Sequence, residues 1–160
     1  MGFEEFLPPA PDNTHTLPEV TLERVIHAMA GHGVELTPAE HNVPAASANL
    51  NGVAVSFGCL GTTVIVRAEA LTDIDTTSGD AVLYMAANQV NSLQMLARAA
   101  VVDQADKLIV RTEHEIAAGA GLSDEQLAGA LKAAVDGVLA TMDGLTVVAE
   151  QLREAFPSQG

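Results

Sequence analysis

Cysteine, tryptophan and positive charge are scarce in this sequence. Its 160 residues include one cysteine, Cys59, no tryptophan, one tyrosine and four phenylalanines. A single cysteine excludes an internal disulfide and fits a reducing compartment. With so few aromatic rings, the core must be built from Val, Leu, Ile, Met and Ala, and a hydrophobic fraction of 48% supplies enough of them.

The deficit of positive charge restricts the classes of partner. Seven Lys and Arg residues stand against 21 Asp and Glu residues, which gives a net charge of −14. Binding to nucleic acid needs clustered Lys and Arg to neutralise phosphates, and adsorption to anionic lipid needs them too. We therefore expect no nucleic-acid partner and no membrane partner. The acid excess keeps the protein soluble or forms an acidic face for a basic partner.

Long apolar runs are absent as well. No stretch approaches the 18 apolar residues of a membrane-spanning helix, and no apolar run follows a charged N-terminal region as in a signal peptide. We expect a cytoplasmic protein.

Motifs of nucleophilic and nucleotide chemistry are missing too. No G-x-S-x-G occurs. The segment Gly58-Cys59-Leu60-Gly61 resembles neither a phosphate-binding loop nor a dinucleotide fingerprint. Cys59 has no base near it in sequence, which is typical of a small packing residue. His114 lies on the face of its strand that we assign to the core, where a paired histidine is the ordinary case.

The histidines and acids do not show the spacing of a metal site. His27 and His32 are five residues apart and so point to different faces of a helix, and His41 follows after a further nine residues. Asp73 and Asp75 lack the spacing of a calcium loop. We predict no metal and no cofactor.

The first half of the chain reads as an arm, a helix and a hairpin. Residues 1–18 form an irregular, proline-rich acidic arm, and a helix follows from about Pro18 to Ala30, with Thr16 and Glu19 at capping-box spacing. Residues 34–50 add at most one short strand. Strand-like alternation then covers about 53–58 and 62–71. In the helix expected at about 18–30, the apolar stripe consists of Leu22, Val25, Ile26 and Met29.

A second helix begins after Ser78 or Asp80, and a second hairpin follows with strands at about 96–102 and 107–117. The side chains that we expect this helix to bury are Val82, Met85, Ala86, Val90 and Leu93. On the outer sheet face, Arg67, Arg98 and Arg111 are expected in solvent near Glu69, Glu113 and Glu115, as cross-strand ion pairs.

The final helix is the most informative element. Ser123 and Gln126 form a capping box, and the helix can continue to Ala155, which at 1.5 Å per residue is about 48 Å. That length exceeds the sheet, unless Gly137 and Gly144 allow a bend. The distal half therefore predicts a partner or dimer surface, for which the candidate residues are Leu145, Val148 and Leu152, with Asn88 and Asn91 on the second helix.

The element order is about αβββαββα. It predicts an α+β fold in which an antiparallel sheet of two hairpins carries helices on one face.

Several segments resemble the YbjN family. They are Ala87-Asn88-Gln89-Val90-Asn91, Leu96-Ala97-Arg98-Ala99, the turn 103–106, Leu108-Ile109-Val110-Arg111 and the helix start 121–127. The resemblance covers about 19–155 and places a single YbjN-like domain at 19–156. The sequence departs from the family at Gln89 and Val90, where an aromatic residue is expected near the paired asparagines. The family resemblance implies a fold similar to type III secretion chaperones, often homodimeric, and a role in sensory-transduction regulation.

Together these patterns predict a non-enzymatic protein-binding or regulatory domain, homodimeric and with an unknown protein partner. An enzyme with an unrecognised site near Cys59, His114 or the loop Asp73–Asp80 is the alternative, and a structural subunit of a larger complex is a third hypothesis.

Overall fold

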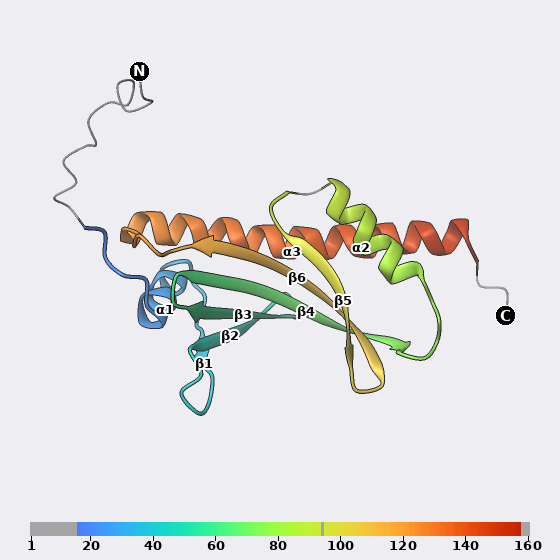
Figure 1. Cartoon of the computed structure of the whole chain (residues 1–160), viewed down its shortest axis with the longest axis horizontal. Coiled ribbons are helices and arrows are strands. Elements are labelled where there is room, and N and C mark those ends of the chain that lie inside the picture. The colour runs from blue at the N-terminus through green and yellow to red at the C-terminus, as the bar shows by residue number, and fades with distance from the viewer. Residues whose placement is uncertain (1–15, 94, 158–160) are drawn as a thin grey trace, which may run out of the picture.

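The computed structural model describes residues 16–93 and 95–157 (Figure 1). The first fifteen residues of the expected arm at 1–18 lie outside this part of the chain. The elements, in chain order, are α1 (Leu22–Gly31), β1 (Thr37–Pro38), β2 (Ala45–Leu50), β3 (Val53–Leu60), β4 (Thr63–Asp75), α2 (Val82–Leu93), β5 (Arg98–Gln104), β6 (Lys107–Ala117) and α3 (Asp124–Ala155).

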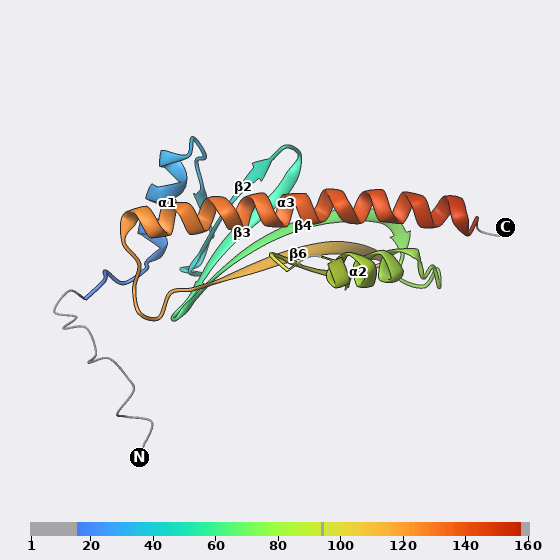
Figure 2. The same cartoon turned by 90° about the horizontal axis from the view of Figure 1, so that it is seen from above.

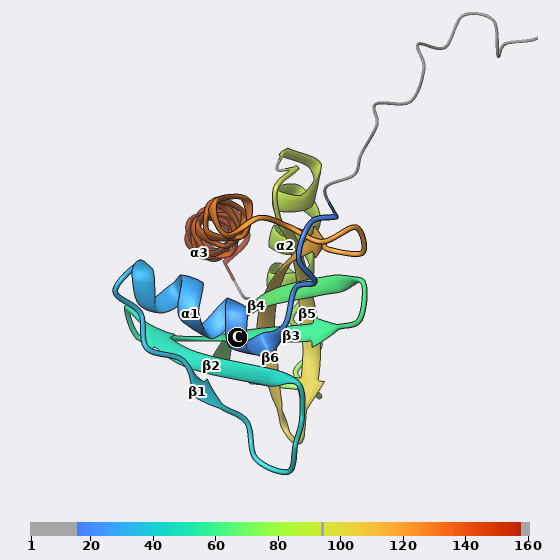
Figure 3. The same cartoon turned by 90° about the vertical axis from the view of Figure 1, so that its left-hand side faces the viewer.

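The strands form one antiparallel sheet in the order β1-β2-β3-β4-β6-β5. All three helices lie on the same side of this twisted sheet (Figures 2 and 3). The predicted α+β class and the one-sided arrangement are therefore confirmed. Residues 34–50 contain two strands where we expected at most one. The additional strand, β1, has two residues and ends at Pro38, so it is too short to produce an alternating pattern.

Helix α1 starts later than predicted. Its N-cap is Thr21, whose side chain accepts a hydrogen bond from the Arg24 N–H, so the expected capping box at Thr16 does not form. The cause lies in the preceding residues. The Arg24 side chain donates hydrogen bonds to the carbonyls of Pro18 and Glu19, and the Leu122 N–H donates to Pro18. The carbonyls of Pro18 and Glu19 therefore accept hydrogen bonds from groups other than helical backbone N–H groups, and the helix does not include these residues.

The two hairpins have the predicted faces. Val55 and Phe57 on β3 are buried, as are Val64, Val66 and Ala68 on β4. In the register, Phe57 is opposite Val66, and Val66 is opposite His114 on β6. The core therefore lies between this sheet face and the helices.

Helix α2 buries part of the predicted stripe, since Ala86 and Val90 are inside as expected. The residues inside are Leu83, Ala86, Ala87 and Val90, whereas Met85 and Leu93 are exposed. The helix carries apolar residues on two adjacent faces, so periodicity alone could not tell which of them meets the core.

Helix α3 is a continuous element of 32 residues that extends along the whole molecule (Figure 1). Its capping box at Ser123 and Gln126 is present, as predicted. Above the middle of the sheet, the buried Thr112 hydroxyl on β6 donates to the Val138 carbonyl at 2.9 Å. In the described ranges, neither α3 nor another helix combines the length and the apolar character needed to cross a membrane.

We predict that Gly121→Ala destabilises the protein by about 2–4 kcal/mol. Gly121 has a φ of +79°, and a Cβ there would lie 2.4 Å from the Leu17 carbonyl oxygen. Gly129, inside α3 and facing open space, is the matched control. Gly129→Ala should raise stability by about 0.5–1 kcal/mol because alanine favours the helix. Thermal unfolding followed by circular dichroism measures the stability of both variants. Equal effects of the two substitutions would contradict the steric conflict with the Leu17 carbonyl.

Candidate functional site

The acidic loop proposed for an enzyme site lies far from Cys59. Cys59 is opposite Val64 near the start of β4, whereas Asp75 ends that strand opposite Lys107. The β6 residues opposite Val64 and Asp75 are Ile116 and Lys107, which are nine positions, or about 30 Å, apart along an extended strand. The loop Asp73–Asp80 and Cys59 therefore cannot act on one substrate group.

Cys59 and His114 also remain apart. Both side chains belong to the core face, but β4 lies between their strands, which places β3 and β6 about 10 Å apart. The His114 Nδ1 is hydrogen-bonded to the Leu96 carbonyl instead. Partial burial raises the pKa of the Cys59 thiol, which favours the unreactive protonated form. The described residues thus assemble no nucleophile and base from these groups.

The three histidines considered for a metal lie in separate settings. His32 Nε2 is 2.8 Å from the Ala128 carbonyl oxygen, His41 is in an exposed turn, and His27 lines a shallow hollow beside Arg24. Within residues 16–93 and 95–157, no three His, Cys, Asp or Glu side chains are grouped as metal ligands would be. The lack of a metal or cofactor stays a prediction.

The outer sheet face carries the expected charge pairs. Arg67 Nε is 2.6 Å from Glu113 Oε1, and Arg111 Nε is 2.7 Å from Glu69 Oε1. Arg98 is exposed at the start of β5. The predicted strand phase is therefore confirmed, and this face resembles a solvated surface more than a catalytic one.

The distal half of α3 is mostly core. Leu145 is 2% exposed, and Val148 and Leu152 are half-buried. Helix α2 packs alongside the distal half of α3, above the end of the sheet, and covers side chains there (Figures 1 and 2). Our length argument compared α3 with the sheet and left α2 out of account. Leu145 is thus not available as a surface residue in this structure.

The exposed apolar side chains gather instead on α2 and on the connection to β5. Of eleven large hydrophobic residues that the described chain exposes, five lie between positions 84 and 96. Exposure is 75% for Leu93, 98% for Met95 and 61% for Leu96. We call this set the α2 surface, and it consists of Tyr84, Met85, Leu93, Met95 and Leu96.

Charge is nearly absent from the same stretch. No acidic residue occurs between Asp80 and Asp103, and Arg98 is the single charged residue there, although the chain has 21 acids. A second acid-free stretch, 41–68, forms β2, β3 and half of β4 and so supplies the sheet. Interface cores are depleted of charge because buried charges are costly to desolvate. Sequence reasoning missed the α2 surface, for which the uncharged run between Asp80 and Asp103 was the available signal.

Asn91 joins α2 to the outermost strand. Its side-chain Nδ2 donates to the Ala99 carbonyl at 2.8 Å, and its Oδ1 accepts from the Ala99 N–H at 2.7 Å. The carboxamide therefore pairs with β5 as the backbone of a neighbouring strand would. Asn88, the other predicted surface asparagine, is exposed.

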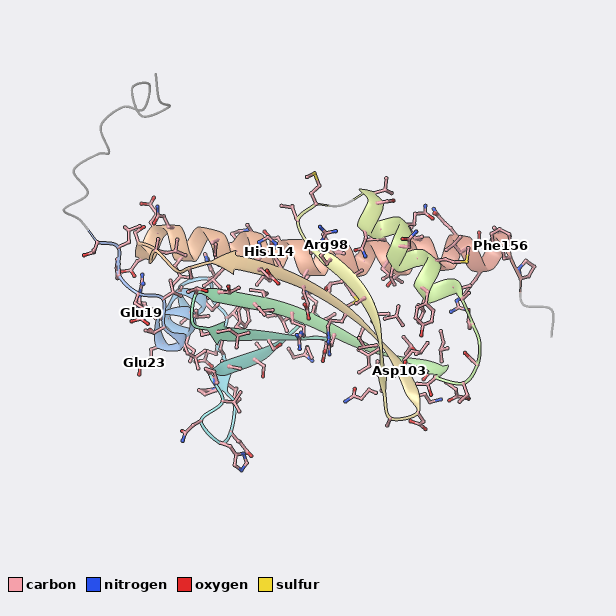
Figure 4. The ribbon with its side chains drawn as sticks, viewed as in Figure 1. Glu19, Glu23, Arg98, Asp103, His114 and Phe156 are labelled. Carbon is pink, nitrogen blue, oxygen red and sulfur yellow. The ribbon has the colours of Figure 1, made fainter. Side chains whose placement is uncertain are left out.

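Asp80 fastens the start of α2 to the end of α3. Its Oδ1 accepts from the Val82 N–H at 2.8 Å, and its Oδ2 is 3.0 Å from Arg153 Nη1. The hydrogen bond from Val82 lowers the pKa of Asp80, and Arg153 lowers it further. This link holds α2 beside the distal part of α3, near Phe156 (Figure 4).

Comparisons with known proteins identify the kind of domain. The family model YbjN, described as "Putative bacterial sensory transduction regulator", matches residues 21–145. The crystal structure of YbjN from E. coli is similar in fold, at 19% sequence identity and a TM-score of 0.65, covering 84% of this chain and 96% of that one. No curated protein matches the chain.

Two structures that contain type III secretion chaperones also align with the chain. SycH from Yersinia pestis, solved with a fragment of YscM2, has 16% identity and a TM-score of 0.44, covering 76% of this chain and 99% of that one. The HopA1–SchA chaperone–effector complex contains a chain with 12% identity and a TM-score of 0.46, covering 79% and 97%.

We predict that Asn91→Ala lowers the free energy of unfolding by about 1–2 kcal/mol, because the Ala99 N–H and C=O lose their partners. Asn88→Ala is the control on the same helix and should change stability by less than about 0.5 kcal/mol. Urea unfolding at low protein concentration measures both. Equal losses would show that the pairing with Ala99 contributes nothing.

The Asp80 link should depend on pH. A carboxylate whose pKa is lowered in the folded state stabilises the protein above its ordinary pKa of 3.8, and this stabilisation is lost as the pH falls through the lowered value. Asp80→Asn should therefore reduce Tm at pH 7 by about 1–2 °C, with the difference vanishing at low pH. Asp136→Asn, which removes an exposed pair with Lys132, should leave Tm nearly unchanged. A difference that persists at low pH would refute the role of the charge.

Proposed function

The chain belongs to the YbjN family, and we propose that it is a non-enzymatic, cytoplasmic protein-binding domain with a regulatory role, whose binding site is the α2 surface. The observation that carries this proposal is the exposure of five large apolar side chains on one helix and its adjoining connection. Leu93, Met95 and Leu96 are close along the chain, and Met95 and Leu96 line one hollow, so they can form an apolar patch of the kind that marks interaction surfaces.

The energetics favour a partner at this surface. Burying one such side chain is worth about 1.5–3 kcal/mol. Leu93 and Met95 project from the protein with most of their area in water. The stretch between Asp80 and Asp103 adds no carboxylate to such a contact, and the acids nearest to Met95 are Glu113 and Glu115 of β6, which line a hollow with it and with Arg98.

The first partner that we propose is a second copy of the chain. Two copies with a net charge of −14 each repel one another, so they associate most readily where acids are absent. The α2 surface contains no acid of its own, and Arg98 lies next to it beside Glu113 and Glu115. An enzymatic function has less support, because Cys59, His114 and the loop 73–80 lie apart.

We predict that the double substitution Leu93→Glu with Met95→Glu shifts the protein toward monomer in light scattering. The charges would repel across the interface, and the apolar contacts would be lost. Since both side chains are exposed, the monomer should fold normally, as circular dichroism can check. Val43→Glu is the matched control, because Val43 is 51% exposed in the turn between β1 and β2.

Two results would contradict this proposal. In the first, the wild-type protein stays monomeric in light scattering up to high concentration, and affinity capture from its own cytosol recovers the same proteins with the wild type as with the double variant. The other is an equal loss of association in Val43→Glu, which would assign the effect to added negative charge in general.

A further inference from the structure

The two edges of the sheet differ. At one edge, β1 has two residues and ends in Pro38, whose nitrogen carries no hydrogen to donate. At the other edge, β5 has seven residues and pairs only with β6 among the described strands. A strand of this length with an open side can pair with another chain.

The register shows which backbone groups of β5 face outward. Gln104 is opposite Lys107 across a two-residue turn, so these two residues form a hydrogen-bonded pair. Hydrogen-bonded and non-hydrogen-bonded pairs alternate along an antiparallel ladder. The N–H and C=O groups of Ala99, Val101 and Asp103 therefore point away from β6. The bonds between Asn91 and Ala99 agree with this assignment.

We propose that β5 pairs antiparallel with β5 of a second copy, in the register that places Val102 opposite Val102. This inference rests on the proposed function, because it specifies how the two copies meet beside the α2 surface. In this register, Val101 and Asp103 of one copy exchange backbone hydrogen bonds with Asp103 and Val101 of the other. Asn91 keeps its bonds to Ala99.

Neighbouring registers are less favourable for reasons visible in the structure. A pair centred on Val101 or on Ala100 requires the Ala99 backbone, which Asn91 already occupies. A pair centred on Asp103 sets two aspartates directly opposite, where like charges repel. The register centred on Val102 uses both remaining outward residues and avoids both conflicts.

Charge and position support a second copy as the occupant. Arg98 and Asp103 lie toward opposite ends of β5, and Arg98 is near His114 (Figure 4). With Val102 at the centre, the antiparallel arrangement turns the Arg98 end of each copy toward the Asp103 end of the other, so the ends that approach one another carry opposite charges. Helix α2 packs against β5, which is the last strand at its end of the described sheet.

The test is disulfide cross-linking in a Cys59→Ala background, which has no other cysteine. Cα atoms in a directly opposed, non-hydrogen-bonded pair are about 4.5 Å apart, within the range of a disulfide. Val102→Cys should therefore form a covalent dimer on mild oxidation. Ala100→Cys is the control on the same strand. Its two copies would be offset by four residues, about 13 Å, and should cross-link at least about ten-fold more slowly.

The outcomes separate this inference from the proposed function. If light scattering shows a dimer that Leu93→Glu with Met95→Glu disrupts, but Val102→Cys cross-links no faster than Ala100→Cys, the strand pairing is wrong and the α2 surface stands. If the wild type never dimerises, the β5 pairing is wrong as well. In that case, a different protein partner that binds the wild type but not the Leu93→Glu, Met95→Glu variant would still support the α2 surface.

A second arm tests the positioning role of Asn91. Asn91→Ala releases the Ala99 backbone and permits the register centred on Val101, which forms more hydrogen bonds between the strands. Cross-linking through Val101→Cys should then rise relative to Val102→Cys. An unchanged ratio in a folded Asn91→Ala protein would overturn the claim that Asn91 sets the register.

Discussion

The structure depends on covering one apolar sheet face with a single long helix. Helix α3 packs against α1, α2, β4, β5 and β6, and it is pinned above the centre of the sheet by the bond from Thr112 to the Val138 carbonyl. Because Thr112 is fully buried, its hydroxyl needs a partner, and the helix backbone provides one at a defined position. Sliding α3 along the sheet would break this bond, so the contact sets the axial position of the helix.

The position of α3 in turn decides where α2 can lie. Helix α2 lies beside the distal part of α3, above the end of the sheet, and it is held at its start by the pair of Asp80 and Arg153. This packing buries one apolar stripe of α2, which includes Leu83 and Val90. Tyr84, Met85 and Leu93 on its other sides, and the connection to β5, remain uncovered. The exposed α2 surface is therefore a consequence of how the core is closed, since α3 and β5 bury only the side of α2 that faces them.

Much of this fold could be predicted from the sequence. The hairpins followed from strict alternation, as at Val64, Val66 and Ala68, and α3 followed from its capping box at Ser123. The failures occurred where a tertiary contact overrides a local signal. The start of α1 depends on Arg24, which reaches Leu122 and Asp124 about a hundred positions away. Likewise, the predicted site on α3 ignored α2, because no pattern within α3 reveals a helix lying beside it.

The choice of asparagine at position 91 fits the surroundings of β5. Proteins commonly protect a sheet edge with lysine, proline or a very short strand, and β1 with Pro38 uses the last two. Asn91 satisfies one N–H and one C=O without bringing a charge into the stretch between Asp80 and Asp103. A carboxamide has the donor and acceptor of a peptide group, so it closes the edge at Ala99 only. Protection by a charged residue would exclude all strands from β5, whereas this local closure excludes some registers and leaves Val101 and Asp103 accessible to one.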